Sequence, residues 1–341
     1  MSGYNRSDGK VYLLGGGSGD IELLTLKGAR VLAYADVVLY DRLVNPLFLF
    51  LAKKQAEFIY CGKLPDAHTL SQSEIDTMLV ELALAGKTVV RLKGGDPAIF
   101  GRVGEEMAVL EDSGITYEVI PGITAASAAS IYAGIPLTHR ELTSHVTLIT
   151  GHRKVDETMD YGAFVGGSLA CYMGVKNLSE IIDALIKAGQ SPETPIAIIT
   201  WGSYGRQQVI TSTLATVDIK AITNPSMIII GDVVKCRREL SWFESLPFFG
   251  RQLLLVSQYE IQWEELTAYT GKGADVWALQ VGEAEDPRFS EATRRYLREQ
   301  HWPEIVFLDK EETTRALLVE ELKSLGLQDS PLMVLAQEHH V

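Results

Sequence analysis

Five predicted strands each end in a glycine-rich loop with residue types suited to holding a small ligand. One loop is Gly15-Gly16-Gly17-Ser18-Gly19-Asp20, and another is Lys93-Gly94-Gly95-Asp96-Pro97. Glycine lets backbone amides approach a ligand closely, because no side chain stands in the way. One glycine turn is ordinary punctuation between elements. Five at strand ends predict a surface where the backbone meets a ligand.

The first of these loops partly matches the dinucleotide-binding pattern G-x-G-x-x-G. Gly15 and Gly17 fit, and an acidic residue follows about 20 positions later, as Asp36 or Asp41. The sixth position, however, is Asp20 instead of glycine. A nicotinamide-dependent oxidoreductase is therefore a weakly supported alternative, and a structural turn is the commoner explanation of this loop alone.

The elements that must position these loops alternate between short apolar runs and helical patterns. In the helix predicted over 71–85, Ser71 and Glu74 form a capping box and Gly86 provides the stop. This alternation predicts an α/β protein with a largely parallel sheet, whose ligands bind beyond the carboxyl ends of the strands. The predicted strands cover residues 11–14, 37–40, 89–92, 117–120, 146–150, 169–173, 196–200, 227–230, 253–256, 276–279, 305–308 and 332–336.

Composition narrows the class of protein. The net charge of −13 disfavours nucleic acid as a partner, and no apolar run approaches the ~20 residues of a membrane span. Cys61, Cys171 and Cys236 lie far apart, which argues against a structural zinc site and fits a reducing cytosol, so we expect a cytoplasmic enzyme with no metal. The last segment, 251–341, is the most acidic, with 17 acidic and 9 basic residues.

Several longer motifs carry a resemblance to known proteins, in a shared order and spacing. They are Gly17–Asp20 with Leu23–Gly28, Ala35–Val44, Gly62-Lys63, His68 and Gln72, Val90–Arg102, Glu105-Glu106, Pro121–Ser127, Gly134–Arg140, Thr150–His152 and Tyr172–Gly174. Through these motifs, about residues 10–244 resemble the uroporphyrinogen-III C-methyltransferases of the tetrapyrrole methylase family.

The resemblance implies a fold and a reaction. It implies two α/β lobes, about residues 10–125 and 126–248 after an N-terminal tail of 1–9, with the methyl donor in the cleft between them and a homodimeric assembly. It implies transfer of two methyl groups from S-adenosyl-L-methionine to ring carbons of uroporphyrinogen III, with S-adenosyl-L-homocysteine as by-product. The product would be precorrin-2, which leads to sirohaem or cobalamin.

The resemblance also implies roles for particular residues. Asp41 matches a proposed base and Lys63 a proposed proton donor, and Asp20 is a second acidic candidate. An ion pair with Arg42 or a helix cap is the structural alternative for Asp41. Donor-binding candidates are Ser18, Gly94, Gly95, Asp96, Ile99, Thr124, Ala125, Met173 and Gly202. Because the substrate carries eight carboxylates, basic side chains are the substrate-binding candidates, namely Arg42, Arg102, His139, Arg140 and His152.

Three positions depart from the family pattern. Ser18 replaces a common proline, Leu64 a basic residue, and Val103 a glycine at a helix start. None of them removes Asp41 or Lys63, so we expect an active enzyme.

Residues 249–341 form a separate segment in this interpretation. Its opening, Phe249–Val256, resembles that of a uroporphyrinogen-III synthase, but the segment is too short for both lobes of that enzyme. We expect a residual α/β lobe that serves stability or assembly, with a regulatory domain as the alternative, and we expect methylation to survive its deletion.

Three other functions remain as alternatives. A precorrin methylase of the same fold would transfer one methyl group. A non-catalytic tetrapyrrole-binding protein would need neither Asp41 nor Lys63. The third alternative is the oxidoreductase, which Asp20 disfavours.

Overall fold

The computed structural model describes residues 9–62, 70–152, 160–239, 241–282, 286–288, 290–299 and 301–337. The chain divides into two compact units, each of which is described by itself. The first unit combines Met1–Gly122 with Gly250–Val341, and the second is Ile123–Phe249. No helix in the described part of the chain is long and apolar enough to cross a membrane.

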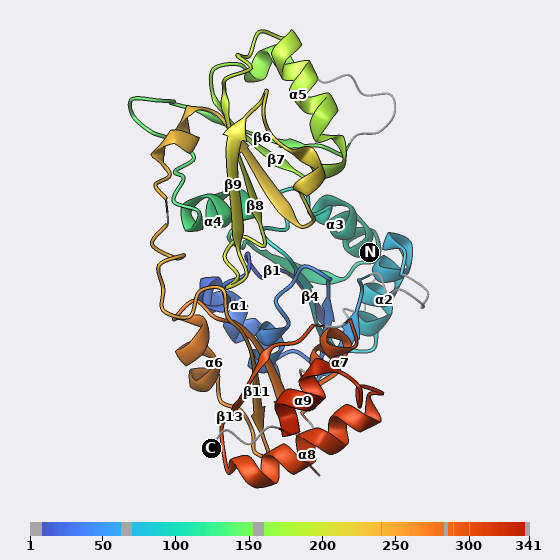
Figure 1. Cartoon of the computed structure of the whole chain (residues 1–341). Helices are drawn as coiled ribbons and strands as arrows, with labels where there is room; N and C mark the ends of the chain where they lie inside the picture. Colours follow the sequence, from blue (N-terminus) through green and yellow to red (C-terminus); the bar gives the residue numbers. More distant parts are fainter. Residues whose placement is uncertain are drawn as a thin grey trace, which may run out of the picture. The chain divides into compact units, whose positions relative to one another are not determined.

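The first unit is built on a five-stranded parallel sheet of order β3-β2-β4-β1-β5. Two of its strands, β1 and β4, are labelled in Figure 1. Its strands are β1 (Lys10–Gly15), β2 (Val37–Tyr40), β3 (Glu57–Tyr60), β4 (Thr88–Lys93) and β5 (Thr116–Ile120). The other elements before residue 123 are η1 (Ile21–Leu23), α1 (Leu26–Leu32), η2 (Pro46–Leu51), α2 (Gln72–Leu84) and α3 (Val103–Asp112).

Alternating side chains of this sheet pack on its two faces. Val11, Leu13 and Leu39 join a buried cluster with Leu79 of α2 and Leu110 of α3. Residues of the opposite parity meet α1 and η2, since Gly28 lies against Leu14 and Gly16 against Leu92 and Phe48. This period of two follows from strand geometry, and it decides which polar residues share a face.

The predicted helix start at Ser71 is confirmed. The Ser71 hydroxyl accepts a hydrogen bond from the Glu74 amide, and the Glu74 carboxylate accepts one from the Ser71 amide. The helix ends before Gly86, whose φ of 78° suits glycine.

The second unit contains a mixed sheet of order β6-β7-β10-β8-β9, in which only β6 and β7 pair in parallel. Its strands are β6 (Val146–Thr150), β7 (Ser168–Tyr172), β8 (Pro195–Thr200), β9 (Gln208–Thr213) and β10 (Ser226–Ile230). Helix α4 (Ala125–Tyr132) packs with the apolar residues of one face and α5 (Leu178–Lys187) with those of the other. The antiparallel pairs differ from the predicted parallel pattern, since a short connection brings β9 back along β8.

The C-terminal segment of the first unit has a three-stranded parallel sheet of order β12-β11-β13. Its elements are β11 (Gln252–Ser257), α6 (Trp263–Thr270), β12 (Asp275–Gln280), α7 (Ser290–Arg298), β13 (Glu304–Phe307), α8 (Glu311–Ser324) and α9 (Pro331–Gln337). The segment has a buried apolar cluster of its own, to which Leu254, Leu279 and Leu318 belong.

One predicted strand is wrong. Residues 332–336 form helix α9 instead of a strand. Proline is favoured at a first helical position, as Pro331 is here, and the Ser330 hydroxyl accepts a hydrogen bond from the Met333 amide. A short apolar run does not by itself distinguish a buried strand from a helix. Strands β3 and β9 were not predicted.

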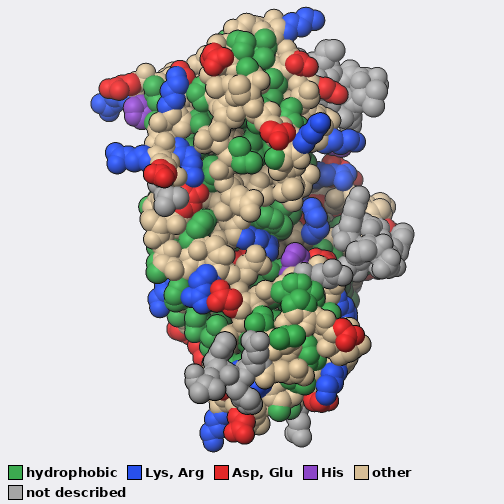
Figure 2. All heavy atoms as spheres, in the orientation of Figure 1, with side chains coloured by type: hydrophobic (Ala, Val, Ile, Leu, Met, Phe, Trp, Pro, Cys, Tyr) green, Lys and Arg blue, Asp and Glu red, His purple; other side chains and the backbone are tan. Residues whose placement is uncertain are grey.

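The surface carries charges of both signs. On the face drawn in Figure 2, acidic and basic side chains of the described residues are interspersed, and no broad basic patch appears among them.

Candidate functional site

The loops after β1 and β4 lie side by side at the carboxyl edge of the first sheet. From β1 the chain continues to β2, which lies beyond β4 in the sheet, and from β4 it continues to β5, which lies beyond β1. The two connections therefore run in opposite directions across the sheet, and the strand order reverses here. Ligands of open α/β sheets bind outside the carboxyl ends at such a point. The first glycine loop and the Lys93–Pro97 loop therefore meet where a ligand is expected.

Backbone packing explains several of the glycines in these loops. Gly17 and Gly95 exchange two backbone hydrogen bonds, of 3.1 and 2.6 Å, and both have positive φ. A Cβ on Gly122 would lie 2.3 Å from the Gly95 carbonyl oxygen, and one on Gly15 would lie 2.6 Å from the Gly122 nitrogen. Three strand-end loops thus touch backbone to backbone, which a side chain would prevent.

Gly94 differs from these glycines. The three atoms nearest to a Cβ at this position would belong to Leu43, at the ordinary contact distance of 3.5 Å, and the φ of Gly94 is not in the left-handed region. Internal packing therefore does not require glycine here.

Asp96 fastens the Lys93–Pro97 loop to its neighbour. One carboxylate oxygen accepts a hydrogen bond from the Ala98 amide at 2.8 Å, and the other accepts one from the Gly122 amide at 3.2 Å. The Ile99 amide donates to the Asp96 carbonyl and closes the turn. These contacts give Asp96 a structural role in shaping the predicted donor loop.

Asp41 is held by Arg91, not by Arg42. The Arg91 guanidinium donates to the Asp41 carboxylate at 2.6 Å and to Glu106 at 3.3 Å. Lys93 donates to the same Glu106 oxygen at 2.7 Å. Arg91 and Lys93 lie two residues apart on β4, so both point to the face covered by α2 and α3.

This cluster of Asp41, Arg91, Lys93 and Glu106 is deeply buried except at one end. The side chains of Arg91, Lys93 and Glu106 are 3%, 6% and 0% exposed, whereas Asp41 is 33% exposed. Burial lowers the pKa of Arg91, but Asp41 and Glu106 outweigh that effect and raise it, so the guanidinium stays charged. The arrangement orients the Asp41 carboxylate while leaving it accessible.

The cluster was not recognised from the sequence, although a signal for it exists. Arg91 and Lys93 interrupt an otherwise apolar central strand, where a charged side chain needs a partner. Lys93 is accordingly buried and paired with Glu106.

The remaining candidates of the first unit lie at the same edge of the sheet. Asp20 caps η1 by accepting a hydrogen bond from the Glu22 amide at 2.8 Å. The Asn45 side chain donates to the Gly19 carbonyl at 2.7 Å, so the loop that contains Asp41 is tied to the one that contains Ser18 and Asp20. Lys63 lies outside the described residues.

In the second unit the other donor-binding candidates gather around the start of α4. The hydroxyls of Thr124 and Tyr172 are 2.6 Å apart, and the Ala126 amide donates to Tyr172 at 3.2 Å. Tyr172 was not predicted as a site residue, although it immediately precedes Met173. A Cβ on Gly202 would lie 2.4 Å from the Ala129 Cβ, so glycine lets this loop approach α4.

Backbone strain is concentrated in these strand-end loops. Five described residues other than glycine have positive φ, namely Phe100, Arg102, Met173, Trp201 and Ser203. Three of them are Met173 and the two neighbours of Gly202. Such conformations cost about 1–3 kcal/mol each and occur often at functional sites. The Met173 side chain is nevertheless 53% exposed, so it does not serve core packing.

The predicted substrate-binding basic residues are not brought together by any contact between them in the described structure. Arg102 is exposed and makes two hydrogen bonds to Glu105, at 2.8 and 2.6 Å, which raise its pKa. The His139 Nδ1 accepts a hydrogen bond from the Glu141 amide within its own turn. Arg42, Arg140 and His152 are exposed.

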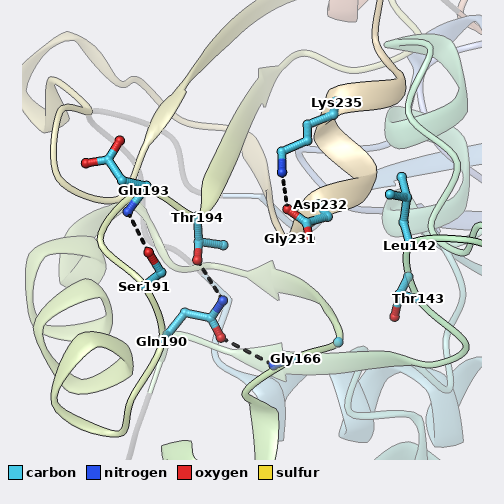
Figure 3. A pocket seen from close by; sticks show the side chains of 11 residues that line it. Leu142, Thr143, Gly166, Gln190, Ser191, Glu193, Thr194, Gly231, Asp232 and Lys235 are labelled. Carbon is cyan, nitrogen blue, oxygen red and sulfur yellow. Dashed lines mark hydrogen bonds and ion pairs between the residues drawn. The ribbon is translucent and has the colours of Figure 1, made fainter.

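The second unit also contains a cavity of about 340 Å³ (Figure 3), and Thr143 of its lining exchanges backbone hydrogen bonds with His139. Much of its polar lining is satisfied internally: Lys235 pairs with Asp232 at 2.7 Å, and Gln190 donates to Thr194 at 2.7 Å. None of the predicted site residues lines it. In the described part of the chain, no group of three or more His, Cys, Asp or Glu residues is arranged to hold a metal ion.

Comparison with known proteins agrees with the fold. A family model described as Tetrapyrrole (Corrin/Porphyrin) Methylases matches residues 10–218. The chain belongs to the tetrapyrrole methylase family, which confirms the resemblance at that level.

Within the family, the similarity is to proteins named uroporphyrinogen-III C-methyltransferase. One from Priestia megaterium is 51% identical over 234 residues, which cover 66% of this chain and 98% of that protein. One from Bacillus subtilis strain 168 is 48% identical over 278 residues, covering 79% of this chain, but the chain spans only 57% of its length. A crystal structure of the Thermus thermophilus uroporphyrin-III C-methyltransferase, complexed with S-adenyl homocysteine, matches with a TM-score of 0.57 and 37% identity over 66% of this chain and 93% of that one.

Proposed function

We propose that the protein is a uroporphyrinogen-III C-methyltransferase that uses S-adenosyl-L-methionine. It would methylate two ring carbons and form precorrin-2 for sirohaem or cobalamin synthesis. The observation that carries this proposal is the 51% identity over nearly the full length of a relative with that name. The accessible carboxylate of Asp41 at the edge of the first sheet also supports the proposal, because the reaction needs a base.

In this proposal the chain provides orientation and proton transfer. When bound, S-adenosyl-L-methionine supplies an activated methyl carbon on a sulfonium. Methylation of a ring carbon must be followed by loss of a proton, which Asp41 would accept. Arg91 holds the Asp41 Oδ1, which fixes the direction of the carboxylate. A positioned base typically contributes about 100- to 10,000-fold to rate. Lys63 as proton donor and Asp20 as second acid follow from the resemblance.

The proposed donor-binding residues fit a ligand that is held mainly by backbone groups. Gly94 and Gly95 precede the turn that Asp96 secures. Packing does not require glycine at position 94, because a Cβ there would find ordinary contact distances to Leu43, and ligand binding would account for the glycine. Ser18, Ile99, Thr124, Ala125, Met173 and Gly202 complete the proposed set. Arg42, Arg102, His139, Arg140 and His152 remain the proposed contacts to substrate carboxylates.

Three further expectations belong to the same proposal. The methylase region would comprise residues 10–248, followed by a separate segment of 249–341. The enzyme would act as a homodimer. It would work in the cytoplasm, which is consistent with the composition of the chain.

The test is anaerobic incubation of the protein with uroporphyrinogen III and S-adenosyl-L-methionine, followed by mass analysis. A product with two added methyl groups is expected. Asp41→Asn should lower turnover by about 100-fold or more and leave donor affinity near that of the wild type. One added methyl group would instead indicate a different precorrin-type methylase. No product despite donor binding would indicate a binding protein.

Gly94→Ala tests the donor loop separately. Because the added methyl group finds ordinary contact distances, thermal stability should be unchanged. The affinity for S-adenosyl-L-methionine, measured by calorimetry, should fall about tenfold or more. Unchanged affinity would remove Gly94 from the site.

A further inference from the structure

Residues 250–341 lie beyond the matched family model and form one compact unit with residues 1–122. Three contacts between these two parts are described below. The similar protein from Priestia megaterium is matched over 98% of its length by 66% of this chain, so about a third of this chain has no counterpart in that protein. The contacts of this C-terminal segment therefore concern a feature that such a relative lacks.

The first contact is an ion-pair cluster. Arg288 donates to Asp286, to Glu260 at 2.8 Å, and to the backbone carbonyl of Phe50 in η2 at 2.8 Å. Lys54 also pairs with Glu260 at 2.8 Å. The side chains of Asp286 and Arg288 are 0% and 9% exposed, so these charges are withdrawn from water where the segment meets η2.

The second contact lies at the ends of β2 and β3. The Arg295 guanidinium of α7 lies 3.8 Å from the centroid of the Tyr60 ring. Tyr60 in turn packs against Tyr40, with ring centroids 5.4 Å apart. A cation over an aromatic face is attracted by the ring quadrupole, and the planar guanidinium stacks well there. A third, lighter contact joins Gly271 after α6 to Glu22 of η1.

These two tyrosines are the last residues of their strands, directly before the predicted catalytic positions. Tyr40 precedes Asp41, and Tyr60 is three residues before Lys63. The Tyr60 hydroxyl also lies so close to Gly62 that a Cβ there would be 2.2 Å from it, and 2.9 Å from the Cβ of Arg42. Arg295 is thus joined to the site by an unbroken series of contacts.

The contact approaches the strand ends from the side opposite to the Arg91 cluster. Asp41 shares the parity of Leu39, whose side chain packs with α2 and α3, whereas Tyr40 points to the other face. Arg91 therefore secures the Asp41 carboxylate on one face, while Arg295 secures the preceding residue on the other.

We propose that the C-terminal segment is a positioning module of the methylase, in which Arg295 clamps Tyr40 and Tyr60 and so orders the chain at Asp41 and at Gly62. The expected effect on kcat rests on the proposed function, whereas the expected ordering of the chain at these positions does not. It departs from the sequence-based expectation that methylation survives without the segment.

The test uses the full chain with Arg295→Ala, Arg295→Lys and the matched control Arg298→Ala, an exposed arginine of the same helix. Arg295→Ala should lower kcat about tenfold or more, with the affinity for S-adenosyl-L-methionine within about twofold of the wild type. Arg295→Lys, which keeps a cation over Tyr60, should recover part of the loss. Arg298→Ala should behave as the wild type.

Amide hydrogen exchange provides the readout that does not depend on activity. Exchange at residues 40–42 and 60–62 should accelerate in Arg295→Ala and not in Arg298→Ala. Wild-type kcat and exchange in Arg295→Ala would overturn the proposal, as would an equal loss in Arg298→Ala. A lower melting temperature with unchanged kcat would also overturn it, because that result describes a purely stabilising contact. If the wild type itself gives no methylation, the proposed function fails, and exchange alone decides whether the segment orders the chain at these positions.

Discussion

Arg91→Met is the substitution whose effect can be worked out most fully from the structure. Arg91 and Lys93 face the carboxylates of Asp41 and Glu106, so the buried cluster contains two charges of each sign. Methionine keeps much of the length and apolar character of the stem but removes one positive charge. Removing one partner of a buried pair typically costs about 3–5 kcal/mol, because a buried charge is left uncompensated.

Hydrogen exchange of the β4 amides measures this cost locally. A loss of about 3–5 kcal/mol accelerates exchange in a core strand by roughly two to four orders of magnitude. The matched control is Arg30→Met, at an exposed position of α1, which should change stability by less than about 0.5 kcal/mol.

Adding Glu106→Gln to Arg91→Met restores the charge balance, because only Lys93 and Asp41 remain charged. The double variant should therefore be more stable than the sum of the two single effects predicts, by about 0.5–3 kcal/mol. Strict additivity, or a cost below about 1 kcal/mol for Arg91→Met, would refute the description of a coupled buried cluster.

Three smaller predictions follow from other parts of the chain. Gly122→Ala should lower the melting temperature, because the added Cβ would lie 2.3 Å from a carbonyl oxygen. The control Gly104→Ala, whose Cβ would have no atom within 4 Å, should be neutral or stabilise the protein by up to about 1 kcal/mol. Equal effects of the two substitutions would contradict the described packing of the loops. Burial raises the pKa of Cys61 to about 11, so a thiol reagent at about pH 8 should label the half-buried Cys236 before Cys61. Mass analysis of labelled peptides measures the order of labelling, and rapid labelling of Cys61 would count against the prediction. Hydrogen bonds from two lysines lower the pKa of Glu118 to about 2, so the stability that Glu118 contributes is present above about pH 4.5 and is lost as the pH falls toward 2. Glu118→Gln should remove this pH-dependent contribution, which is below about 1 kcal/mol because the side chain is partly exposed. An unchanged acid-denaturation profile would contradict this prediction.

Local patterns in the sequence were sufficient to predict most strands and the capped helix α2. Apolar periodicity and capping residues act within a few positions of one another, so they can be read along the chain. The same patterns were insufficient for α9, where five apolar residues fit either element. They were also insufficient for β9 and for the antiparallel strands, whose pairing depends on connections and on partners distant in sequence.

The candidate site divides in the same way. The motifs predicted which loops matter, and the structure brings those of the first unit together at one sheet edge. An ion pair with the adjacent Arg42 was one structural alternative for Asp41, yet the partner is Arg91, 50 residues away. Adjacent strand residues point to opposite faces, so a neighbour in sequence is seldom a neighbour in contact.

The sequence by itself was therefore sufficient to predict the strand-end glycine loops. The resemblance of its motifs to a known family identified that family and the acidic candidate at position 41. Only the tertiary structure decided how that carboxylate is held and which glycines are required by packing. It also revealed the contacts of the C-terminal segment with Tyr60 and Phe50. The reason is physical: burial and charge pairing depend on distances between strands and helices, and those distances exist only once the chain has folded.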